Sequence, residues 1–250
     1  MRRNTWIVIG VVVIVVGLAM LLSPMVGRTQ GSDTRAFSGV AVVEFDLENS
    51  PIEVRADGDE VVVEYSYSSG LFASTSVDLD QSGDILRLEQ DCPGFFIGWG
   101  CQASFELTVP AGVEVMGSTS NGAVVVAGVE GPVEVTTSNG AISLEDLSSP
   151  VLARTSNGAI SGEGLGSDDV DVASSNGRIT LRFAEAPTSV SARSSNGAIE
   201  VFLPADAGSY AVDTSTSNGR VSTDIRTDPS APQSISLRTS NGDITVGYDD

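Results

Sequence analysis

The fold is indicated by residues 133–145, which read VEVTTSNGAISLE. Apolar and polar residues alternate on both sides of the central Ser-Asn-Gly, and this period of two is typical of β-strands with one buried face. The sequence therefore predicts two short strands joined by a sharp corner at Ser138-Asn139-Gly140. The same tripeptide occurs seven times between residues 120 and 242.

The spacing of these copies indicates a repeat architecture. Their asparagines follow one another at intervals of 18, 18, 19, 20, 22 and 23 residues. A period near 20 is typical of stacked units that are each too small to bury their own apolar face. The residue three positions after each asparagine is Val or Ile, so the stack would carry a β-branched column in its core. We predict an all-β fold, a single β-solenoid with 18–23 residues per coil.

The corners themselves admit two interpretations of the fold. Asn-Gly between alternating hydrophobic residues is the strongest short-range signal for a β-hairpin, so a hairpin meander stays open as an alternative. A hairpin requires only Asn-Gly, whereas this chain also keeps the preceding Ser and a spacing of one coil. In a solenoid, identical asparagines can form a hydrogen-bonded ladder along one edge, and Asn and Gly tolerate the left-handed backbone that a sharp corner needs.

The predicted structural ladder consists of one asparagine from each copy: Asn121, Asn139, Asn157, Asn176, Asn196, Asn218 and Asn241. An alternative is that the corners form a ligand-binding strip, because solenoids often use repeated side chains on one edge for recognition.

The N-terminal segment predicts a membrane anchor. Residues 6–26 are uncharged and mostly apolar, and this length spans a bilayer as a helix. Arg2 and Arg3 before the segment and Arg28 after it favour a cytoplasmic N-terminus. A cleaved signal peptide is the alternative, but no A-x-A-like site follows the apolar run. We therefore expect a single-pass protein of the cell membrane with an extracytoplasmic C-terminal domain.

The predicted domain organisation has four parts. These are a cytoplasmic tail over 1–5, a transmembrane helix (signal anchor) over 6–26, a polar linker over 27–36 and the solenoid domain over 37–250. Within the solenoid domain, residues 37–117 lack Ser-Asn-Gly and are predicted to form atypical N-terminal coils of the same stack, as terminal repeats often do. The seven Ser-Asn-Gly coils occupy residues 118–250, and Asn49-Ser-Pro-Ile52 is a candidate degenerate first corner.

Composition limits the partners of the chain. It holds 33 acidic residues against 13 basic ones, which gives a net charge of −20, and every basic residue is Arg. Such an acidic surface repels nucleic acid, and its spread over the whole chain with no Lys resembles the composition of extreme halophiles. Acidic clusters such as Asp168-Asp169-Val-Asp171 do not have the spacing of a known calcium motif, so no metal site is predicted.

The two cysteines, Cys92 and Cys101, are predicted to form a disulfide, because paired cysteines in an exported domain are usually oxidised. Between them lie Phe95, Phe96 and Trp99. This short loop is either an apolar plug over the core or, if its rings are exposed, a candidate contact loop for a partner.

The repeats also support a family resemblance. Seven copies of Ser-Asn-Gly-x-Ile/Val, preceded by Leu107-Thr-Val-Pro110-Ala-Gly112 and joined by links such as Gly128-Val-Glu-Gly131-Pro132-Val133, resemble the prokaryotic putative-adhesin family of β-strand-repeat proteins. The resemblance extends from Phe37 to Tyr248. It implies a β-helix-like fold on exported or membrane-anchored proteins, and it implies no catalytic residues.

We expect a non-catalytic, adhesin-like binding or structural module that has no cofactor. Its expected partners are the membrane, through the N-terminal helix, and a cell-surface or envelope protein or a glycan. An envelope sensor or regulatory partner of other membrane proteins is the alternative function. A carbohydrate-active β-helix enzyme is less favoured, because the chain has no His or Lys and no repeated carboxylate pair that would serve as acid and base.

Overall fold

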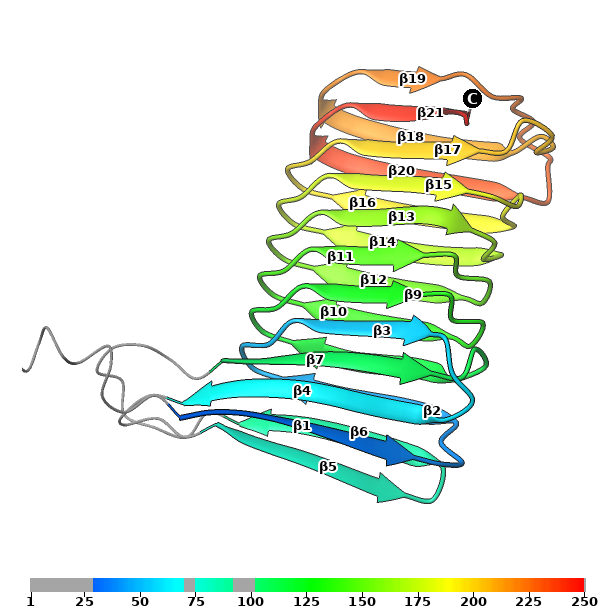
Figure 1. The fold of residues 1–250 in the computed structure, drawn as a ribbon. Helices are drawn as coiled ribbons and strands as arrows, with labels where there is room; N and C mark the ends of the chain where they lie inside the picture. The colour runs from blue at the N-terminus through cyan, green and yellow to red at the C-terminus, as the bar shows by residue number, and fades with distance from the viewer. Residues whose placement is uncertain (1–28, 70–74, 92–101, 250) are drawn as a thin grey trace, which may run out of the picture.

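The computed structural model describes residues 29–69, 75–91 and 102–249, which fold into one sheet of 11 strands and one of 10. Figure 1 shows the chain winding between these two facing sheets as a tall stack of coils. In spatial order, the eleven-stranded sheet contains β1 (Thr29–Phe37), β4 (Val61–Ser69), β7 (Gln102–Val109), β3 (Ile52–Ala56), β9 (Val124–Ala127), β11 (Ile142–Glu145), β13 (Ile160–Leu165), β15 (Ile179–Phe183), β17 (Ile199–Leu203), β21 (Ile244–Tyr248) and β19 (Val221–Thr223). The ten-stranded sheet contains β18 (Ala211–Asn218), β20 (Ser234–Asn241), β16 (Ser189–Ser194), β14 (Asp169–Ser174), β12 (Val151–Thr155), β10 (Val133–Thr137), β8 (Glu114–Thr119), β2 (Val42–Leu47), β6 (Ile85–Asp91) and β5 (Ser76–Ser82).

Each Ser-Asn-Gly corner joins strands of different sheets, as between β10 and β11. Neighbouring coils pair in parallel, with Val133 opposite Val151 in one sheet and Ile142 opposite Ile160 in the other. A two-residue hairpin would instead place the flanking strands antiparallel and side by side. The hairpin meander is therefore excluded, and the chain in this region is a solenoid.

The core lies between the sheets and is built from the inward half of each alternating strand. Strand β10 shows this directly, since Val133, Val135 and Thr137 are buried while Glu134 and Thr136 are exposed. The residues three positions after the corner asparagines form a single column with Ile52 at one end: Ile52, Val124, Ile142, Ile160, Ile179, Ile199, Ile244 and Val221. All are buried except Val221, which is 45% exposed at the end of the stack.

The order of coils in the stack departs from their order in the sequence at both ends. Strands β20 and β21, the last in the chain, lie between β16/β17 and β18/β19 (Figure 1). Strands β2 and β3 likewise lie between β6/β7 and β8/β9. The first and the last complete coils of the described chain are thus interior layers, with hydrogen-bonded neighbours on both sides.

The atypical N-terminal region belongs to the same two sheets. Strands β1 and β4 extend the eleven-stranded sheet beyond β7, and β5 extends the ten-stranded sheet beyond β6, with all of these added strands antiparallel to their neighbours. The linker predicted over 27–36 is wrong from Thr29 onward, because β1 pairs with β4 along its whole length. A polar strand is tolerated there because β1 is the edge of its sheet.

The predicted fold class needs one correction. The described residues contain two sheets and no helix, and within them no helix is available that could cross a membrane. The tail predicted over 1–5 and the helix predicted over 6–26 lie outside the described residues. In the described chain the backbone groups pair between coils instead of within a helix, because a period of two places one face of each strand in the core. The fold class is accordingly corrected to an all-β, two-sheet solenoid, and the single-pass location in the cell membrane that rested on the helix is withdrawn.

Candidate functional site

The structure brings the seven corner asparagines together along one edge. Each Nδ2 donates to the Oδ1 of the next asparagine in the stack, over 2.7–2.9 Å, from Asn218 through Asn241 and Asn196 down to Asn121. The chain of bonds ends on Asn49, in the segment Asn49-Ser-Pro-Ile52. It follows the spatial order of the coils, so Asn241 lies between Asn196 and Asn218.

A second column of polar side chains lies just inside the corners, and sequence reasoning missed it. Two residues before each asparagine stands a Thr or Ser whose hydroxyl donates to a backbone carbonyl of the next coil over 2.9–3.1 Å. The donors are Thr119, Thr137, Thr155, Ser174, Ser194, Thr216 and Thr239. Except at Thr119, the acceptor is the glycine of a neighbouring Ser-Asn-Gly. The signal was present in the sequence, because every copy has Thr or Ser at this position.

The corner glycines are required by close packing between coils. A Cβ added to Gly140 would overlap the carbonyl oxygen of Gly122, and one added to Gly158 would overlap that of Gly140. The expectation that the corners need a left-handed backbone is wrong, because none of the corner asparagines or glycines in the described residues has a positive φ. Glycine is present because the backbones of adjacent coils approach too closely for a side chain.

Beside the corners, the outer face of the ten-stranded sheet carries a groove of about 600 Å³, which we call the arginine groove. Strands β10, β12, β14, β16, β18 and β20 contribute to it. Its described lining residues are hydroxyl-bearing except for one alanine and three arginines: Thr136, Thr137, Arg154, Thr155, Ser156, Ala173, Ser174, Ser175, Arg193, Ser194, Ser195, Ser215, Arg238, Thr239 and Ser240. None of these described lining residues is acidic, in a chain with 33 carboxylates against 13 arginines.

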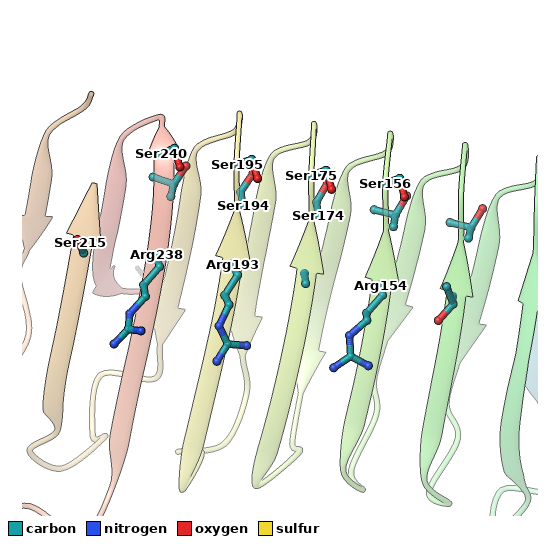
Figure 2. Close-up of a pocket in the computed structure, with 15 residues that line it drawn as sticks. Arg154, Ser156, Ser174, Ser175, Arg193, Ser194, Ser195, Ser215, Arg238 and Ser240 are labelled. Carbon is teal, nitrogen blue, oxygen red and sulfur yellow. The ribbon is translucent and has the colours of Figure 1, made fainter. Parts of the chain in front are cut away.

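The arginines of this groove occupy one row. Arg154, Arg193 and Arg238 each lie three residues before a corner asparagine, and the strand register aligns them. Figure 2 shows their side chains running in the same direction along the sheet, away from the exposed corner serines Ser156, Ser175, Ser195 and Ser240. Arg238 lies next to Arg193 only because β20 is inserted beside β16.

Two aspartates flank the row of arginines. Asp171 lies 3.5 Å from Nη2 of Arg154 and 3.3 Å from Nη1 of Arg193, and Asp213 lies 2.6 Å from Nη2 of Arg238. All three arginine side chains are about half exposed, and such surface ion pairs contribute little to stability. Each guanidinium has five N–H donors, so these pairs leave donors that can bind a ligand.

The remaining predicted site residues have different outcomes. Cys92, Cys101 and the candidate contact loop with Phe95, Phe96 and Trp99 lie outside the described residues. Within the described ranges, no group of acidic or cysteine side chains has the arrangement needed to hold a metal ion.

Two described carboxyl groups have a lowered pKa, Asp33 through its hydrogen bond from Arg35 and Asp228 through its hydrogen bonds from Ser230.

Comparison with solved structures found distant likenesses. A putative cell adhesion protein from Clostridium sporogenes is 9% identical, with a TM-score of 0.39, and the match covers 88% of this chain and 100% of that one. Putative adhesins from Bacteroides fragilis and Parabacteroides distasonis are 10% and 14% identical, with TM-scores of 0.47 and 0.44, and each match covers 88% of this chain and 97% of the other. At such low identity and TM-score none of these likenesses bears on function. A comparison with curated proteins found no match.

One family model matches the repeat region of this chain. The Toastrack DUF4097 model matches residues 111–247, a range that contains all seven Ser-Asn-Gly corners and the whole arginine groove. Because this match covers more than half of the chain, the protein belongs to the Toastrack DUF4097 family.

Proposed function

We propose that this protein is a non-catalytic, adhesin-like binding module that holds an anionic ligand in the arginine groove. The observation that carries the proposal is the row of Arg154, Arg193 and Arg238 in the groove, whose ion pairs with Asp171 and Asp213 leave guanidinium donors for a ligand. The rest of the chain is strongly acidic, so these three arginines make the groove more favourable for an anion than the carboxylate-rich surface around it.

The side-chain chemistry of the groove supports recognition of anions. Guanidinium groups donate two parallel hydrogen bonds to carboxylate, sulfate or phosphate, which gives both energy and geometry. The neighbouring hydroxyls of Ser156, Ser175 and Ser195 are exposed and lie one strand apart, so they add neutral donors and acceptors along the same line.

The same chemistry supports a role in binding over one in catalysis. The whole chain lacks His and Lys, and the basic groups of the groove are arginines, which stay protonated in proteins. An arginine cannot accept a proton from a serine hydroxyl, so the serines of the groove have no general base among its lining residues.

The test measures binding of the purified chain to an immobilised panel of neutral glycans, acidic glycans and acidic peptides. We expect at least one anionic ligand to bind and the triple variant Arg154→Gln, Arg193→Gln, Arg238→Gln to lose at least about tenfold in affinity, since hydrogen bonds between charged groups contribute this much.

Arg178→Gln is the matched control, because Arg178 is an exposed arginine that pairs with Glu200 on the other sheet. Its affinity should equal that of the wild type. The proposal is overturned if no anionic ligand binds, or if the triple variant binds as tightly as Arg178→Gln.

A further inference from the structure

The row of arginines has one gap, at Ala173. The strand register places Ala173 between Arg154 and Arg193 and at the same level along the strands. Parallel strands lie about 4.8 Å apart, so the two arginines that flank the gap are separated by about 10 Å at their backbones. Ala173 lines the groove, and its small side chain leaves room there between the two long cationic side chains.

Asp171 shows how the two flanking arginines behave toward a carboxylate. It lies two residues before Ala173 on β14, on the same face, and its Oδ2 and Oδ1 approach Arg154 and Arg193 at 3.5 Å and 3.3 Å. Both distances exceed the 2.7–2.9 Å of a well-formed bond between a guanidinium and a carboxylate. One carboxylate thus draws both arginines toward the gap while satisfying neither of them fully.

We propose that the ligand of the groove is an acidic glycan, and that one of its anionic groups sits above Ala173, bridged by Arg154 and Arg193. This inference rests on the proposed function and adds the class of ligand and its position. The sugar hydroxyls then meet the exposed hydroxyls of Ser156, Ser175 and Ser195, which run parallel to the row of arginines. Because one serine follows each strand, hydrogen-bonding positions repeat along an extended oligosaccharide.

The groove fits a glycan better than the other polyanions. Single-stranded nucleic acids are held by stacking of their bases on aromatic rings, and no aromatic residue is among the described lining residues. The net charge of −20 also repels a polymer with a phosphate on every unit. An acidic peptide could not add to the groove as a strand, because the strands that form the groove are already paired on both sides, except for β18 at one end of the sheet.

Calorimetric titration with oligogalacturonate tests the inference. The matched ligand is the methyl-esterified oligomer, which has the same sugars without the charge. Dextran sulfate and uncharged dextran form a second pair, which separates sulfate from carboxylate as the anionic group. We expect at least one charged glycan to bind, and its uncharged counterpart to bind at least about tenfold more weakly.

The position above Ala173 is tested with Ala173→Glu, which places a carboxylate of the protein itself in the gap. We expect this variant to lose about as much affinity for the charged glycan as the triple arginine variant. Ser118→Glu is the matched control, since Ser118 lies in the same row of the sheet but outside the groove, and it should lose less than about threefold. Circular dichroism of each variant checks that the fold is intact.

Asp171→Asn is expected to raise the affinity for the charged glycan, whereas the preceding variants lower it. It removes the carboxylate that competes for Arg154 and Arg193, so the charged glycan should bind several-fold more tightly. A purely structural role of Asp171 in holding the arginines would make binding weaker instead.

The outcomes separate the inference from the proposed function. If the triple arginine variant binds every charged ligand as tightly as the wild type, the groove is not the binding site and both fail. If the triple variant loses affinity while Ala173→Glu behaves like Ser118→Glu, the groove binds anions but the position above Ala173 is wrong. Equal binding of each glycan and its uncharged counterpart, or tighter binding of single-stranded DNA, overturns the acidic glycan.

Discussion

At the scale of single residues, the corner tripeptide combines two different constraints. The asparagine side chains point outward and bond to one another, whereas the glycines have no room for a side chain because adjacent coils touch through their backbones. The Thr or Ser that precedes each corner, buried in every copy except the one with Thr216, bonds to the same backbone. Each position of the repeated Thr/Ser-Ser-Asn-Gly is therefore explained by contacts between coils, with the exception of the exposed serine, which lines the groove in four of the seven copies.

The first prediction concerns the glycines. Gly140→Ala forces a Cβ against the carbonyl oxygen of Gly122, and neither backbone can move without disturbing the pairing of both sheets. We expect the free energy of unfolding to fall by about 2 kcal/mol or more, as overpacking of a close contact does. Urea unfolding followed by circular dichroism measures this change.

Gly112→Ala is the control for that substitution, because a Cβ at Gly112 would meet no heavy atom within 4 Å. Its free energy of unfolding should stay within about 0.5 kcal/mol of the wild type. Equal effects at the two positions would show that the corners do not need glycine for close packing.

The second prediction concerns the asparagine ladder. Asn157→Ala removes one bond to Asn139 and one from Asn176, so unfolding should become easier by about 1–2 kcal/mol. Asn218→Ala, at the end of the ladder, removes only the bond to Asn241 and should cost about half as much. Chemical unfolding of both variants measures the difference. A smaller effect at Asn157 than at Asn218 would contradict a stabilising ladder.

The positions of most of these repeated residues could be predicted from the sequence. The spacing of the tripeptide gave the positions of the corners, and the β-branched residues three positions later gave a core column. The role of glycine could not be predicted, because the sequence does not reveal how closely two backbones approach. The row of arginines could have been found by aligning the repeats, since Arg154, Arg193 and Arg238 share one position relative to the corner.

At the scale of elements, the main finding is that the last coil is inserted between two earlier ones. The polarity of the residues that face the core gives a physical reason for this order. Strands β20 and β21 direct Ile235, Leu237, Ile244 and Val246 inward, and all four are buried. The corresponding residues of β18 and β19 are Val212, Thr214, Val221 and Thr223, none of which is buried. The more apolar coil takes the interior layer, and the coil with threonines takes the end, where water reaches one side.

This difference in polarity is visible in the sequence, but the order in which the coils stack could not be predicted from it. The corners around Asn218 and Asn241 have the same tripeptide, so either could pair with the corner around Asn196. Stacking in sequence order is the simpler expectation, and it would leave Ser215 between Arg193 and Arg238. The order matters for function, because it makes these two arginines neighbours.

The third prediction follows from this insertion. Strand β21 pairs with β17 on one side and β19 on the other, whereas β19 pairs only with β21. We expect the backbone amides of β21 to exchange with deuterium more slowly than those of β19, although β21 is nearer the C-terminus, because opening of an edge strand breaks fewer contacts. Hydrogen exchange read by mass spectrometry on peptides from the two strands measures this. Faster exchange at β21 would show that the last coil frays from the end of the stack.

At the scale of the whole molecule, the dominant feature is charge. The chain has a net charge of −20, and the arginines of the described ion pairs lie at the surface, with 36–60% of each side chain exposed. Surface pairs contribute little, while the repulsion between many carboxylates opposes the compact state. The two sheets therefore hold together mainly through their shared apolar core, against a long-range electrostatic cost.

The fourth prediction is that salt stabilises the fold. Raising NaCl from low concentration to about 1 M shortens the screening length to about 3 Å and removes most of this repulsion. We expect the thermal unfolding midpoint to rise by several degrees, as followed by circular dichroism. Over the same range of salt the affinity for an anionic ligand in the arginine groove should fall, because screening weakens that attraction. A decrease in the unfolding midpoint would show that the ion pairs outweigh the repulsion.

The coils stack in register, in the spatial order that builds the arginine groove, and engineered disulfides between corners report that order. With Cys92 and Cys101 replaced by Ser, two double variants place cysteine pairs at Asn196 with Asn241 and at Asn196 with Asn218. Adjacent coils place equivalent backbones about 4.8 Å apart, within reach of a disulfide, whereas the second pair is about 10 Å apart and beyond it. Mass spectrometry after mild oxidation should find the bond between positions 196 and 241 and none between 196 and 218. A bond between 196 and 218, with none between 196 and 241, would show that the coils stack in sequence order.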